Sequence, residues 1–72
     1  MSAGLVLVDV FEGEEANTPI FVGEFASVPR AGEHLSFEAG GYFRYYNVLE
    51  VWHRQDGVGG KFRPCLRVSL ND

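Results

Sequence analysis

The sequence contains only one cysteine, Cys65, among its 72 residues. A single cysteine cannot form a disulfide within one chain, so the disulfide frameworks that stabilise many small secreted domains are excluded. A short chain without such cross-links needs a dense core or a partner chain, because small domains bury a smaller share of their surface. The hydrophobic residues, 46% of the chain, are numerous enough for a dense core.

Long hydrophobic runs and an excess of positive charge are also lacking. The apolar run of residues 5–8 ends at Asp9. This run is too short for the hydrophobic region of a secretory signal or for a membrane span. A free thiol suits a reducing compartment. We therefore expect a cytoplasmic protein without membrane contacts. The net charge of −4 disfavours nonspecific binding to nucleic acid or to an anionic membrane surface.

The charge is distributed unevenly along the chain. Residues 1–40 contain seven acidic residues and one arginine, a net charge of −6. Residues 41–72 contain three acidic and five basic residues, a net charge of +2. The acidic first half of one copy could therefore attract the basic second half of another copy, in a head-to-tail arrangement.

The hydrophobic pattern is that of β-strands. No segment has a helical period, whereas five segments have the apolar residues, alternation and flanking turn residues typical of strands. These segments are residues 5–11, 20–28, 34–38, 42–54 and 61–70. We expect one all-β domain over residues 1–72, a small five-stranded antiparallel barrel or roll. Gly32 is expected to adopt a positive φ in the turn that begins at Pro29, and Gly40 and Gly41 to form a hairpin connection.

The longest strand segment, residues 42–54, changes its alternation near Leu49 and Glu50. Tyr46 and Val48 share one face, but Val51 and His53 have the opposite parity. One extra residue near Leu49 and Glu50 would bring all four side chains to the same interior, and such an insertion is a β-bulge. Small barrels use bulges to curl a long strand.

The turn Pro29-x-x-Gly32-Glu33 is followed by a short strand and a hairpin, and then by the pattern Tyr46-x-Val48-x-x-Val51-x-His53. In these features the chain resembles short bacterial proteins with SH3-like barrels. The resemblance covers residues 28–70. It implies an SH3-like small β-barrel. It implies no particular activity, because most of these proteins have no assigned function.

No combination of residues indicates catalysis, a cofactor or a metal. His34, His53 and Cys65 lack the closely spaced ligand pairs of zinc sites. Cys65 lies between Arg63 and Arg67, whose charges would favour the thiolate, but no general base accompanies it. We therefore expect a non-enzymatic protein with no catalytic, cofactor-binding or metal-binding residues.

The remaining candidate is an interaction surface of basic and aromatic side chains. If the alternating apolar residues are internal, the outward-facing residues are Arg44, Trp52, Arg54, Lys61, Arg63 and Arg67. Such residues are enriched in protein interfaces, and barrel folds also use them to bind single-stranded nucleic acid. Because the protein is acidic, we favour a protein partner and keep nucleic acid as the alternative.

Self-association is expected because apolar residues occupy both faces of several strands. One small barrel has a single interior, so the residues on the opposite faces would form an apolar patch larger than soluble monomers usually carry. A second copy could cover them, and a two-fold dimer is the first expectation. These candidate self-association residues are Leu5, Leu7, Ile20, Val22, Phe43 and Tyr45.

Overall fold

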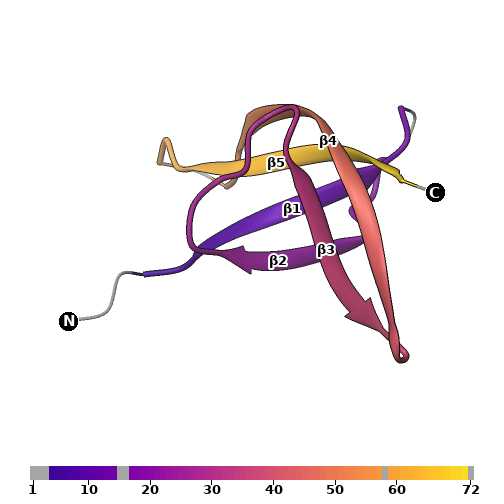
Figure 1. Ribbon diagram of the computed structural model, residues 1–72. Helices are drawn as coiled ribbons and strands as arrows, with labels where there is room; N and C mark the ends of the chain where they lie inside the picture. The colour runs from indigo at the N-terminus through magenta and orange to yellow at the C-terminus, as the bar shows by residue number, and fades with distance from the viewer. Residues whose placement is uncertain (1–3, 15–16, 58, 72) are drawn as a thin grey trace.

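The computed structural model describes residues 4–14, 17–57 and 59–71 and places them in an all-β fold (Figure 1). Its five strands are β1 (Val6–Glu12), β2 (Phe21–Phe25), β3 (His34–Ala39), β4 (Tyr42–Gln55) and β5 (Phe62–Leu70). All five expected strands are therefore present. The second is shorter than expected, because residues 26–31 leave the sheet. Within these described ranges, no helix is long and apolar enough to cross a membrane.

The five strands form one sheet in the order β2-β1-β5-β4-β3, curled into a half-barrel (Figure 1). Three neighbouring pairs are antiparallel, but β1 and β5 run parallel, with Asp9 opposite Cys65. The prediction of a purely antiparallel sheet is therefore wrong for this pair. The physical reason is that alternation specifies which side chains are buried and carries no information about the direction of the neighbouring strand.

A β-bulge lies where the sequence predicts one. Val48 pairs with Val68 and Glu50 pairs with Arg67, so Leu49 is the extra residue in β4. Tyr46 and Val48 on one side of the bulge are buried, and Val51 on the other side packs against the same core. The bulge prediction is thus confirmed. His53 has the same parity as Val51 but lies beyond the core and is exposed.

The core fills the concave side of the half-barrel. Its fully or nearly fully buried members come from β1, β4 and β5, and they are Val8, Val10, Tyr46, Val48, Leu66 and Val68. The described parts of β2 and β3 form no ladder with each other, but the rings of Phe21 and Phe37 lie 5.1 Å apart and link the two edge strands. Phe37 also stacks on Tyr46, with ring centroids 5.7 Å apart.

Glycines in two turns have the conformations that these turns require. Gly40 and Gly41 have φ values of 63° and 90°, as expected for a tight hairpin turn in which both central residues have positive φ. Gly32 has a φ of 95°. Its N–H donates to the carbonyl of Val48 at 2.9 Å, and the N–H of Val48 donates to the carbonyl of Glu33 at 2.8 Å. The β2–β3 connection is therefore fixed to β4 immediately before the bulge.

Candidate interaction surfaces

The outer face of the sheet is organised around a buried carboxylate, Asp9 in β1. Asp9 is 4% exposed and lies between apolar residues of β1. Its two oxygens each lie 3.2 Å from a guanidinium group, one of Arg54 in β4 and the other of Arg63 in β5. Arg63 also lies 3.8 Å from Asp56. The paired arginines allow a charged group to remain buried in this position.

Aromatic rings continue this outer face beside Asp9. Phe11 and Trp52 have ring centroids 5.4 Å apart, and Arg67 lies over the Trp52 ring at 5.1 Å. Arg67 also bonds the carboxylate of Glu50 at 3.3 Å and donates to the carbonyl of Gly13. This cation–π contact and the two hydrogen bonds hold the Arg67 side chain against the sheet. We call this surface the arginine–aromatic layer, defined by Asp9, Phe11, Trp52, Arg54, Arg63 and Arg67.

The structure brings together four of the six predicted basic-surface residues, namely Trp52, Arg54, Arg63 and Arg67. Arg44 lies in the far half of β4, and Lys61 precedes β5. The three arginines of the layer face three carboxylates, those of Asp9, Asp56 and Glu50, so the layer carries little net charge. Charge and alternation alone did not reveal this neutralisation. The available signal was an acidic residue inside the apolar segment of residues 5–11, which indicates a buried partner for arginine.

Cys65 lies beneath the arginine–aromatic layer and is fully buried. Burial raises the pKa of the thiol, and the carboxylate of Asp9 acts in the same direction, while Arg54 and Arg63 oppose them. Sγ lies 3.6 Å from the carbonyl oxygen of Arg63. A buried thiol with a raised pKa is a weak nucleophile at neutral pH.

The two histidines lie on other strands than Cys65, and the nearer of them, His53, stands opposite Pro64. His34 begins β3 and His53 is in the second half of β4, and both are exposed. Across residues 4–14, 17–57 and 59–71, no three histidine, cysteine or acidic side chains are grouped closely enough to hold a metal ion.

The predicted self-association residues are all exposed, and they form two groups. The first, which we call the β1–β2 patch, consists of Leu5, Leu7, Ile20 and Val22. Leu7 is 45% exposed and Val22 is 47% exposed. The second, the hairpin patch, consists of Phe43 and Tyr45, whose rings lie 6.5 Å apart. The two patches come from opposite ends of the strand order, β2-β1 at one end and β4-β3 at the other.

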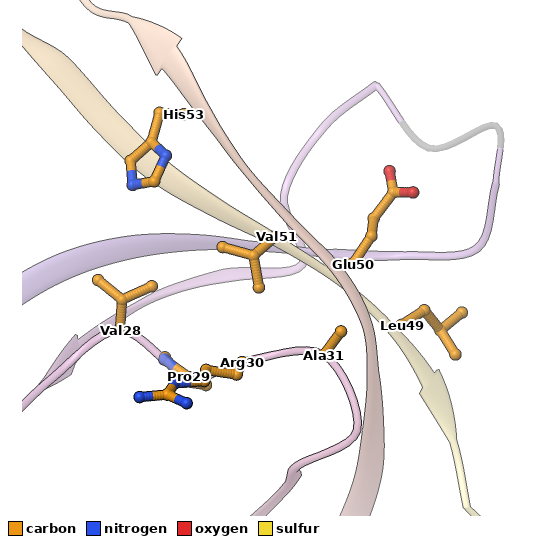
Figure 2. A pocket seen from close by; sticks show the side chains of 8 residues that line it. All are labelled: Val28, Pro29, Arg30, Ala31, Leu49, Glu50, Val51 and His53. Carbon is orange, nitrogen blue, oxygen red and sulfur yellow. The ribbon is translucent and has the colours of Figure 1, made fainter.

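A further surface, absent from the sequence-based candidates, lies between β4 and the β2–β3 connection. It is a pocket of about 520 Å³, which we call the β4-edge groove (Figure 2). Its lining is mostly apolar and consists of Val28, Pro29, Arg30, Ala31, Leu49, Glu50, Val51 and His53. In Figure 2, Val28 and Val51 point toward each other, whereas the Glu50 carboxylate is directed away from the Arg30 guanidinium.

The backbone of β4 beside this groove has hydrogen-bonding groups without a strand partner. Beyond the bulge, the N–H of Asp56 donates to the carbonyl of Lys61 at 2.9 Å. Because every second residue of an antiparallel strand bonds the same neighbour, the even-numbered residues of this part of β4 form the backbone hydrogen bonds to β5. Pro64, which has no N–H, stands opposite His53, in agreement with this assignment. The N–H and C=O groups of Val51 and His53 therefore point to the other edge. No strand in the part of the chain that the structure describes pairs with that edge.

Comparison of the chain with protein-family models, with curated proteins and with solved structures gives no match.

Proposed function

We propose that this protein is a non-enzymatic interaction module that associates with a second copy of itself through the β1–β2 patch and the hairpin patch. The observation that carries the proposal is the amount of apolar surface that the half-barrel leaves outside its core. Phe43 is 62% exposed and Tyr45 is 51% exposed, in addition to Leu7 and Val22. Covering several such side chains is favourable by about 2 kcal/mol each when burial is complete.

The total surface supports the same proposal. The chain exposes 5222 Å², whereas a monomer of 8.0 kDa is expected to expose about 4,450 Å². A larger exposed area is expected for a half-barrel that leaves the apolar side chains of both patches outside its core.

A two-fold dimer can use both patches at once. In such a dimer, the β1–β2 patch of one copy contacts the hairpin patch of its partner, and the same contact occurs a second time by symmetry. This arrangement brings the acidic first half of one chain toward the basic second half of the other. It also closes, so it does not continue into a filament.

The mass in solution tests this proposal directly. Size exclusion with light scattering at micromolar concentration should give twice the 8.0 kDa chain mass. Leu7→Asp and Tyr45→Asp should each return the mass to one chain, because each places an unpaired charge in the interface. Phe62→Asp is the matched control, since Phe62 is 61% exposed but belongs to neither patch. A single-chain mass for the unsubstituted protein at all concentrations would refute the proposal.

The nucleic-acid alternative receives less support from the arginine–aromatic layer, because its arginines are matched by carboxylates. Titration of a labelled single strand at low salt tests it, and binding that weakens steeply with salt would favour it. The SH3-like resemblance and the cytoplasmic location remain predictions that accompany the proposed function.

A further inference from the structure

We propose that the β4-edge groove binds an extended acidic segment of a partner protein, which adds to the sheet as a strand beside the second half of β4. This inference concerns a different surface from the proposed dimer. None of the groove residues belongs to the β1–β2 patch or to the hairpin patch. The two proposals can therefore succeed or fail independently.

The shape of the groove suits an extended chain. One end is closed, because Gly32 and Glu33 bond the backbone of Val48. From that point, residues 28–31 and the second half of β4 diverge, and the space between them has a volume of about 520 Å³ (Figure 2). Residues 51–55 would align with a segment of about five residues, roughly 17 Å long at the rise of an antiparallel strand.

The exposed backbone specifies how that segment would be held. The N–H and C=O groups of Val51 and His53 face the groove and have no strand partner among the described residues. An added strand would pair with them, which is the recognition mode of strand addition. Alternate side chains of the segment would then lie over Val28, Pro29 and Val51, which provide an apolar surface.

The charges at the groove select an acidic partner. The cationic side chain of Arg30 forms no ion pair in residues 4–14, 17–57 or 59–71, and His53 lies exposed at the same groove. The one acidic residue in the lining, Glu50, is occupied by Arg67 at 3.3 Å. An aspartate or glutamate next to the apolar side chains of the segment would therefore meet the Arg30 guanidinium, which has no ion-pair partner among the described residues.

Selection from a displayed library of random 12-residue peptides tests the proposal. The unsubstituted protein and the Arg30→Glu variant are used as targets, and Arg44→Glu is the matched control. Arg44 is also exposed and also lies outside the ion pairs of the described residues, but it is not in the groove. Circular dichroism and a thermal melt verify that both variants fold as the unsubstituted protein does.

The proposal expects enriched peptides that combine alternating apolar residues with aspartate or glutamate. A synthetic peptide of the consensus sequence should bind Arg30→Glu roughly threefold to tenfold more weakly than the unsubstituted protein, and Arg44→Glu with unchanged affinity. N-methylation of alternate peptide bonds on the side that faces β4 should abolish binding, whereas methylation of the intervening bonds should not.

Three results would overturn the proposal. The first is a selection that yields no binders or yields peptides without acidic residues. The second is a consensus peptide whose affinity is unchanged by N-methylation of either set of alternate peptide bonds and is also unchanged by Arg30→Glu in the protein. The third is enrichment of sequences matching this chain itself, which would assign the groove to a second copy instead of a partner protein. The mass measurements above are independent of all three.

Discussion

Replacing Asp9 with alanine tests whether the arginine–aromatic layer stabilises the fold. Asp9 is 4% exposed, and its oxygens lie 3.2 Å from Arg54 and 3.2 Å from Arg63. Without the carboxylate, both guanidinium groups lose their shared partner, and Arg63 Nε is already buried without a hydrogen bond in the described structure. Removing one partner of a fully buried pair costs about 3–5 kcal/mol, whereas an exposed pair contributes about 0.2–1 kcal/mol.

The exposure of the two arginines places the expected loss between those limits. The Arg54 side chain is 54% exposed and that of Arg63 is 29% exposed, so solvent screens both interactions in part. We expect Asp9→Ala to lower the free energy of unfolding by about 2–3 kcal/mol. A domain of 72 residues has a total stability of about 4–11 kcal/mol, so this loss is large enough to measure.

A double-mutant cycle separates the two ion pairs. The two N···O distances are equal at 3.2 Å, so any difference in coupling must come from burial and environment. Asp9 should couple to Arg63 by about 1–2 kcal/mol and to Arg54 by less than about 1 kcal/mol. In the cycle with Arg63→Met, the contact of Arg63 with Asp56 does not contribute to the coupling energy. It is present in both proteins that keep Arg63 and absent from both that carry Arg63→Met.

Urea unfolding followed by Trp52 fluorescence is the appropriate measurement. Trp52 is the only tryptophan and it belongs to the same layer, so its emission reports on the region that is changed. A loss of less than about 0.5 kcal/mol for Asp9→Ala would show that the layer contributes no more than a typical surface substitution. Equal couplings for the two arginines would refute the argument from burial.

Three further predictions concern the core, the thiol and the bulge. Gly23→Ala should destabilise the domain by about 1–3 kcal/mol in urea unfolding, because the added Cβ would lie 2.8 Å from the Phe25 ring. Cys65 should react slowly with iodoacetamide in the folded protein and rapidly in urea. Since burial raises the pKa of the Cys65 thiol, the contribution of this thiol to the free energy of unfolding should be constant below about pH 8.5 and should fall as the pH rises from there toward the folded-state pKa. A pH-independent stability between pH 8 and 10 would contradict this. Val51→Asp should cost on the order of 2–3 kcal/mol and Glu50→Ala less than about 1 kcal/mol, because only the first places an unpaired charge against the core. Similar losses for the two variants would argue against the inward position of Val51.

The strands and the bulge were predictable because both depend on local alternation. The parity change between Val48 and Val51 is visible in the sequence, and burying both residues required one extra residue between them. The positive φ values of Gly40 and Gly41 follow equally from residue type. These features need no knowledge of which strands become neighbours.

Strand order and the surfaces that depend on it were not predictable in the same way. Asp9 and Arg54 are 45 residues apart in the chain, and they meet only because β1 pairs in parallel with β5. Alternation places Asp9 and Arg63 each on an outer face, but it does not identify them as neighbours. The expectation of a basic surface therefore overlooked the carboxylates that neutralise it.

The bulge at Leu49 explains both the closed core and the open groove. By reversing the parity of β4, it turns Val51 toward the core shared with Val48. The pairing of β4 with β3 ends at Asn47, just before the bulge, while the pairing with β5 continues to Gln55. Among the residues that the structure describes, the second half of β4 thus has no strand partner on this edge. Folded proteins usually cover such an edge, because it invites pairing with other chains. Residues 28–31 pass beside this edge but leave a pocket of about 520 Å³. The insertion of one residue therefore directs Val51 into the interior that stabilises this small domain, and the edge at which we expect a partner strand to bind begins immediately beyond it.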